Sequence, residues 1–257
     1  MKRELYNLTD EQLSFLVTTL DKEMHEEGMQ YIVVGGVAVQ AHMLKRLHEK
    51  TGMTLVQLAE NPEMRLQDYI RSTDDVDLAI DSSIQGSLGE VETAKKIFKV
   101  QEGMAVPEVI SPSGESILGY TLARKGLQRP IFQVYLDGET DDDSRVTLNI
   151  GRNTSGLHNL DKQFYDIFVK YGEEIFIPYN ERFELKTRVI SPAHLFASKI
   201  AKFRAKDTMD IHNLADLMRG SGEEIDLSEI KRLVLPDHEI NYVRFLGLTK
   251  LYDTNYD

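Results

Sequence analysis

Apolar and polar positions follow two different periods in the first fifty residues. Over residues 9–28 apolar side chains recur at helical intervals, which predicts a helix. The run Tyr31–Val34 is short and continuously apolar, and it ends at Gly35-Gly36. Such a run indicates a buried strand that enters a glycine turn. Residues 37–50 return to the helical period, so a strand, a glycine pair and a helix are expected in that order.

A strict alternation over Asp75–Ile80 predicts a second strand. Apolar residues beginning with Val76 fall on one face, while Asp75 and Asp77 fall on the other. The pattern is typical of a half-buried strand whose exposed face carries two carboxylates side by side. Between the two strands, the stretch near 51–70 has interrupted periodicity and is expected to be an insertion.

The stretches 131–136 and 145–150 also alternate, and the polar loop between them predicts a hairpin. From Ser191-Pro192 onward the pattern is helical, because proline is favoured in the first turn of a helix. The other expected elements are helices at 55–58, 90–100, 160–171 and 207–218, two helices before the C-terminus, and strands at 174–177 and 183–190.

These elements predict an α/β (α+β) fold in which a small mixed sheet is flanked by helices. We expect a core over residues 1–190, which includes the N-terminal helix and the insertion near 51–70. A helical part is expected over residues 191–257.

Composition removes several classes of protein. The chain has 257 residues, 30 Lys and Arg against 42 Asp and Glu, a formal charge of −12, and no cysteine. Without cysteine there is no disulfide scaffold, thiol nucleophile, zinc ribbon or iron–sulfur cluster. No apolar run approaches the roughly 20 residues of a membrane span, and no signal-peptide core follows the first residues. We therefore expect a cytoplasmic protein with no membrane partner.

Two features carry the chemistry when they are taken together. A glycine pair between a strand and a helix lets a phosphate approach the backbone, and the N–H groups that open the helix bind anions. Two carboxylates on one strand face, such as Asp75 and Asp77, can share a pair of Mg²⁺ ions that assist phosphoryl or nucleotidyl transfer. Each feature alone also fits a tight turn or a solvated strand face.

Three stretches together resemble the DNA polymerase β-like nucleotidyltransferases, most closely the AbiEii-like toxin branch. The resemblance covers about a third of the chain, in the order that the family needs. The stretches are Ile32-Val33-Val34-Gly35-Gly36-Val37-Ala38-Val39-Gln40, then Arg71-Ser72-Thr73-Asp74-Asp75-Val76-Asp77-Leu78, and then Ile190-Ser191-Pro192-Ala193-His194-Leu195-Phe196-Ala197-Ser198-Lys199 with Lys206-Asp207 and Asp210.

The resemblance implies roles for individual residues. Gly35 and Gly36 would hold the triphosphate of an NTP, Asp75 and Asp77 would bind two Mg²⁺ ions, and Lys199 would meet a phosphate. Arg71 is a weaker candidate for a phosphate contact. For Lys199 the alternative is an ordinary place on a solvated helix surface.

The family also places a third carboxylate on a neighbouring strand, where this chain has Asn149. An amide brings no charge and accepts a proton poorly, so the enzyme is either slowed or inactive unless another acid substitutes. A hairpin turning about Asp142 would put Tyr135 opposite Asn149 and Asp137 diagonally across on the same face. Asp137-Gly138 can equally form a tight turn away from the site.

The charge pattern bears on the acceptor. From residue 185 to residue 206 there are six basic residues and no Asp or Glu, a local exception to the acidic total. Such a patch suits a triphosphate or an RNA end, although basic residues are also common at helix C-termini. The residues are Lys186, Arg188, Lys199, Lys202, Arg204 and Lys206.

These observations predict a Mg²⁺-dependent nucleotidyltransferase that moves an NMP from an NTP to an RNA hydroxyl, such as a tRNA 3′ end, or to a protein hydroxyl. The AbiEii-like resemblance implies a toxin of a toxin–antitoxin pair, with an antitoxin as partner. One alternative is an aminoglycoside nucleotidyltransferase, since an acidic protein suits a polycationic substrate. The other is a nucleotide-binding module that has lost catalysis through Asn149.

Overall fold

The computed structural model describes residues 31–64, 66, 69, 75–80, 119–124, 130–135, 145–151, 172–181 and 184–251. The helices expected at 9–28, 90–100 and 160–171, together with Arg71 and Asp137, lie outside these ranges. The strands are β1 (Tyr31–Val34), β2 (Asp75–Ile80), β3 (Gly119–Arg124), β4 (Pro130–Tyr135), β5 (Arg145–Gly151), β6 (Glu173–Pro178) and β7 (Glu184–Val189). The helices are α2 (Gly35–Thr51), α3 (Leu55–Glu60), α6 (Pro192–Lys202), α7 (Ala205–Gly220), α8 (Leu227–Leu233) and α9 (Glu239–Thr249), with a 3₁₀ turn η3 (Pro236–His238).

Within the described residues the strands form one seven-stranded mixed sheet in the order β3-β4-β5-β2-β1-β7-β6. The central strand β1 pairs antiparallel with β2 and parallel with β7, and β2 pairs parallel with β5. Helices pack against this sheet, so the predicted mixed α/β fold is confirmed. The sheet is larger than the sequence suggests, because the strand β3 was not predicted.

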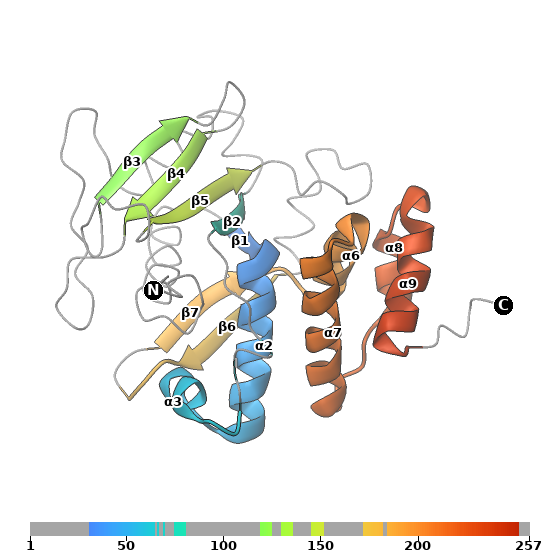
Figure 1. Cartoon of the computed structure of the whole chain (residues 1–257), viewed down its shortest axis with the longest axis horizontal. Helices are drawn as coiled ribbons and strands as arrows, with labels where there is room; N and C mark the ends of the chain where they lie inside the picture. Colours follow the sequence, from blue (N-terminus) through green and yellow to red (C-terminus); the bar gives the residue numbers. More distant parts are fainter. Residues whose placement is uncertain are drawn as a thin grey trace.

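The helices gather on one side of the central strands, as Figure 1 shows. Helix α2 lies between the sheet and α7, and α8 and α9 lie beyond α6 and α7. A continuous cluster of buried apolar side chains runs from β1 and α2 through β6 and β7 into α6–α9. In the helical part of this cluster, the ring centroid of Phe245 lies 5.5 Å from that of Phe196 and 5.9 Å from that of Tyr242.

Several predicted elements agree with the structure to within a few residues. β1 and β2 have the predicted bounds, and α6 begins at Pro192 with Ser191 as its N-cap residue. The hairpin of β4 and β5 is confirmed, but its register is not the predicted one. Asn149 lies opposite Ile131, whereas Tyr135 lies opposite Arg145.

Candidate functional site

The site is built on the junction of β1 and α2. Helix α2 begins at Gly35 directly after β1, so no separate turn intervenes. Gly35 has a φ of +72°, in the left-handed region that favours glycine. The N-cap residue Val34 provides no side-chain hydrogen bond to the helix, and the first N–H groups of a helix have no partner within it. This end of α2 is therefore suited to an anion.

The Asp77 carboxylate lies against this junction. Asp77 stands opposite Val34 across the β1–β2 ladder, one residue before Gly35 along the chain. A Cβ atom built on Gly35 would overlap the Asp77 carboxylate and would lie 3.3 Å from its Cγ atom. Glycine is thus required at position 35 by both the backbone conformation and the close approach of the acid.

The sheet register relates the other two acid positions to Asp77. Asp75 precedes it by two residues in β2 and so belongs to the same strand face. Asn149 of β5 is the register partner of Asp77 in a parallel ladder, which is where the sequence placed the missing third carboxylate.

The hypothesis that Asp137 supplies the carboxylate that Asn149 lacks loses its geometric basis. The prediction needed Tyr135 opposite Asn149, but Ile131 occupies that position. Residue 137 follows Tyr135, whose partner Arg145 lies four residues before Asn149 along β5. The register on which the predicted contact between Asp137 and Asn149 was based is therefore wrong, and Asp137 itself lies outside the described residues.

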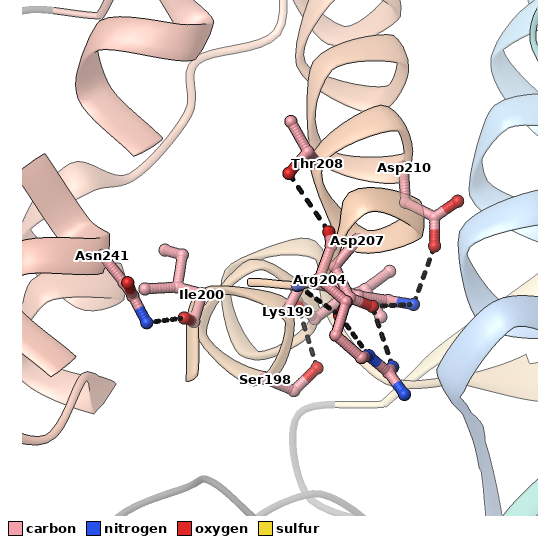
Figure 2. Close-up of polar contacts among 9 residues, drawn as sticks. Ser198, Lys199, Ile200, Arg204, Asp207, Thr208, Asp210 and Asn241 are labelled. Atoms are coloured by element: carbon pink, nitrogen blue, oxygen red, sulfur yellow. Dashed lines mark hydrogen bonds and ion pairs between the residues drawn. The ribbon is translucent and has the colours of Figure 1, made fainter. Parts of the chain in front are cut away.

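A buried ion network joins α6 to α7 and is drawn in Figure 2. Lys199 is only 6% exposed, and its ammonium donates to Asp210 Oδ2 at 2.8 Å and lies 3.4 Å from Asp207 Oδ1. Arg204 also donates two hydrogen bonds to Asp207, from Nε to Oδ2 at 2.7 Å and from Nη2 to Oδ1 at 3.0 Å. The solvated-surface alternative for Lys199 is therefore wrong, because its charge is paired inside the protein.

Asp207 also caps the N-terminus of α7 from the third position of the helix. Its Oδ2 atom accepts a hydrogen bond of 3.0 Å from the backbone N–H of Arg204, the N-cap residue. Burial alone would raise the pKa of Asp207, but the hydrogen bonds from Arg204 and the charge of Lys199 outweigh it and leave the pKa below its ordinary value. Asp207 thus stays ionised and binds two cations as well as the helix N-terminus.

The basic run at 185–206 does not form one patch. Lys186 lies over the Phe176 ring, with its ammonium 5.3 Å from the ring centroid, and Lys199 is buried. The exposed members gather where α6 meets α7, and they are Lys202, Arg204 and Lys206. The predicted basic surface is therefore reduced to this junction.

A second buried network fixes α2 against the strand that leads into α6. His42 is fully buried, and its Nε2–H donates to the Ile190 carbonyl at 2.7 Å. Because a carbonyl only accepts, the proton lies on Nε2, and Nδ1 can accept from Arg46 Nη1 at 3.3 Å. Arg46 Nη2 in turn donates to Glu223 after α7, at 2.5 Å.

The sequence missed both networks as functional features. A histidine and an arginine one helical turn apart on α2 would have suggested that they interact, but their partners Ile190 and Glu223 are more than 140 residues away along the chain. Burial lowers the pKa of His42 to about 3, with the charge of Arg46 acting in the same direction, so this imidazole is neutral at physiological pH.

No metal cage of three or more histidine or carboxylate side chains is found among the residues that the structure describes. Within the same ranges, no helix is long and apolar enough to cross a membrane.

Comparisons with known proteins give structural likeness only. No family model and no curated protein sequence matches the chain. An antigenic nucleotidyltransferase-like protein from Paracoccidioides brasiliensis is similar with 15% identity, a TM-score of 0.44 and coverage of 93% of each chain. MenT4, a nucleotidyltransferase toxin from Mycobacterium tuberculosis H37Rv, is similar with 12% identity, a TM-score of 0.37, and coverage of 84% of this chain and 83% of its own. Because both TM-scores are low, the interpretation of the site depends on its own residues and geometry.

We expect Gly35→Ala to destabilise the protein more than Gly52→Ala. Both glycines have a φ near +70°, so both substitutions carry the same left-handed backbone cost, but nothing lies within 4 Å of a Cβ at Gly52. The overlap with Asp77 should add about 1 to 3 kcal/mol at Gly35. Urea unfolding of both variants measures the difference, and adding Asp77→Ala to Gly35→Ala should remove the excess. Equal costs at the two glycines would contradict the close approach.

The His42 pKa leads to a second expectation, which is that stability falls as the pH drops below 6.5. The unfolded chain binds a proton at His42 near pH 6.5, whereas the folded protein excludes it down to a pKa of about 3. The free energy of unfolding therefore falls by roughly 1.4 kcal/mol for each pH unit of acidification within this window, or by about 2 kcal/mol between pH 6.5 and about pH 5. Urea unfolding at about pH 7 and about pH 5 measures this difference.

The matched variants are His42→Gln, which keeps an N–H donor for the Ile190 carbonyl, and His238→Gln in the η3 turn. The first should show a clearly smaller loss of stability on acidification, and the second should behave like the wild type. The assignment is wrong if His42→Gln retains the full pH dependence.

Proposed function

We propose that the chain is a nucleotidyltransferase that uses Mg²⁺ to move a nucleoside monophosphate from an NTP to a hydroxyl group of RNA, such as a tRNA 3′ end, or of a protein. One observation carries the proposal, namely the contact of the Asp77 carboxylate with the backbone at Gly35. It brings a metal-binding type of side chain to a helix N-terminus, where N–H groups and the helix dipole favour phosphate.

Asp75 and Asp77 fit Mg²⁺ by the chemistry of their oxygen atoms. Mg²⁺ is usually held by one or two carboxylates together with substrate phosphates and water, so a pair on one face of β2 is an adequate protein contribution. When bound, Mg²⁺ supplies charge neutralisation at the oxygens of the transferred group. The backbone at Gly35 and Gly36 would then hold the triphosphate beside these acids.

In the proposed reaction the acceptor hydroxyl attacks the α-phosphorus of the NTP, the bond from that phosphorus to the bridging oxygen breaks, pyrophosphate leaves, and the hydroxyl proton is released to solvent. The protein would contribute mainly positioning and charge stabilisation. Asn149, beside Asp77 in the ladder, cannot take the hydroxyl proton as a carboxylate would.

The acceptor is the less constrained part of the proposal. Exposed Lys202, Arg204 and Lys206 at the α6–α7 junction favour an anionic acceptor such as RNA. The formal charge of −12 favours instead a polycationic aminoglycoside as the second candidate. The resemblance to the AbiEii-like branch adds the proposal that the protein is a toxin with a cognate antitoxin.

We expect Asp75→Asn and Asp77→Asn each to abolish transfer of radiolabelled NMP without unfolding the protein, because each removes a charged metal ligand and little packing. The assay compares total tRNA with a panel of aminoglycosides in the presence and absence of Mg²⁺. Mg²⁺ should raise the melting temperature of the wild type through binding to the folded state, and the double asparagine variant should lose that increment. An equal response to Mg²⁺ in both proteins would show that these acids do not form the metal site.

Variants of Asn149 can distinguish a slowed enzyme from a nucleotide-binding module that has lost catalysis. If the amide weakens an otherwise complete site, Asn149→Asp should raise the transfer rate at least tenfold, which corresponds to roughly 1.4 kcal/mol of barrier. The measurement is single-turnover transfer to the best acceptor, with Asn149→Ala as the control that adds no carboxylate. If Asn149→Asp binds NTP but remains without transfer, the module that has lost catalysis becomes the favoured interpretation.

A further inference from the structure

Helix α9 exposes an apolar stripe to solvent. Among the large apolar side chains of the described residues, Ile240 is the most exposed, at 71%, and Val243 is exposed as well. The two are three positions apart on α9, so they are neighbours on one face of the helix. The opposite face packs into the core through Tyr242 and Phe245. The outward stripe is therefore additional to the face that the fold of one chain uses.

The residue types on this stripe are unfavourable for an isolated helix. Ile240 and Val243 are β-branched and lose side-chain freedom in a helix, and an exposed position returns little packing. Gly247, four residues after Val243, lies on the same face, and glycine is less favourable than alanine inside a helix. Nothing lies within 4 Å of a Cβ built on Gly247, and its φ is not positive. Neither the backbone nor a neighbour within the chain therefore requires glycine there.

A second copy of α9 that runs antiparallel to the first fits this stripe. Ile240 and Gly247 lie equally far from the middle of the stripe, which falls between Val243 and Arg244. A two-fold axis through that point would place Ile240 of one copy opposite Gly247 of the other, where the absent side chain leaves room. The Val243 side chains of the two copies would meet beside the axis. The stripe is thus self-complementary, as an isologous interface requires.

The charges at the two ends of α9 fit the same arrangement. Glu239 begins the helix and Lys250 follows its last residue, about three turns later, so both lie along one edge of the helix. In an antiparallel pair about this axis, the same edges meet in opposite directions, and Lys250 of one copy lies near Glu239 of the other. Asp237, exposed in η3, adds a carboxylate at that end. Glu239 Oε1 is 3.7 Å from Lys231 Nζ within the chain, so the contact would extend an exposed ion pair into a network.

We propose that α9 is the contact surface of a homodimer, in which the helices of two copies pack antiparallel about a two-fold axis beside Val243. Because α9 lies beyond α6 and α7 from the sheet (Figure 1), its outward face contains none of the residues of the candidate site, and the inference does not depend on the proposed function. One helix from each copy makes a small interface, and interfaces below about 1,200 Å² are typical of weak complexes. The dimer therefore exchanges with the monomer.

Sedimentation velocity of the full chain, at concentrations from about 1 μM to about 1 mM, measures this exchange. The wild type should shift reversibly from monomer to dimer. Ile240→Ser combined with Val243→Ser should remain monomeric throughout, with an unchanged midpoint of urea unfolding for the monomer, because both side chains are exposed. Phe176→Ser is the matched control, since Phe176 in β6 is also an exposed apolar residue, and it should dimerise like the wild type.

Gly247→Gln separates the dimer contact from the fold. Its side chain enters open space in the monomer, so the variant should fold at least as stably as the wild type. In the dimer the same side chain would fill the room that Ile240 of the other copy needs, so association should weaken. A Gly247→Gln variant that dimerises as tightly as the wild type would overturn the inference.

Charge reversal tests the direction of the helices. Lys250→Glu and Glu239→Lys each put like charges together at both ends of an antiparallel dimer, so each should weaken it about tenfold. An equimolar mixture of the two variants restores opposite charges at both ends and should associate nearly as tightly as the wild type. In a parallel pair equal ends meet, so single variants that associate like the wild type would overturn the inference. It is also overturned if the wild type stays monomeric at about 1 mM, or if the double serine variant still dimerises.

Discussion

The close approach of the Asp77 carboxylate to the Gly35 backbone is the constraint on which the rest of the site depends. Any Cβ at position 35 would occupy the space of the carboxylate, so only glycine lets the acid of β2 meet the start of α2. Val34 pairs with Asp77, and α2 begins at the next residue, so the sheet register and not a loop fixes the position of the acid. The pairing of β2 with β5 places Asn149 next to Asp77, on the side of β2 that faces away from β1.

The two buried networks keep the helices in place around that contact. His42 ties α2 to the Ile190 carbonyl, at the point where the chain leaves β7 for α6, and Arg46 extends the tie to Glu223 after α7. Lys199 and Asp210 join α6 to α7. Buried charges with complete partners contribute little net stability compared with apolar packing, but losing one partner is costly. Such networks therefore favour one arrangement of the helices over the alternatives.

Sequence patterns predicted what local periodicity can encode. The alternation over Asp75–Ile80 and the apolar run of β1 gave correct strands, and Ser191-Pro192 gave the start of α6. The hairpin register failed for a specific reason. The partner of Asn149 is Ile131 and not the predicted Tyr135, which is a register shift of four residues. An even shift leaves every side chain on the same face of the sheet. Alternation alone therefore cannot choose between the two registers. The pairing of Lys199 with Asp210 was equally hidden, because it depends on the left-handed turn at Phe203.

The distribution of charge matters more to the proposed chemistry than the total of −12. Asp207 and Asp210 are buried and are neutralised by Lys199 and Arg204, so the acids of the α6–α7 junction present little negative charge to solvent. The exposed charges left there are positive. Asp77 of β2 is only partly buried and lies against the junction of β1 and α2. In the proposed function, an anionic substrate would be attracted by the exposed cations of α6 and α7 and repelled by the acids of β2, unless a metal ion neutralises those acids. This asymmetry favours a phosphate-bearing substrate held with Mg²⁺ over a polycation, which would bind the acids directly and be repelled by the junction.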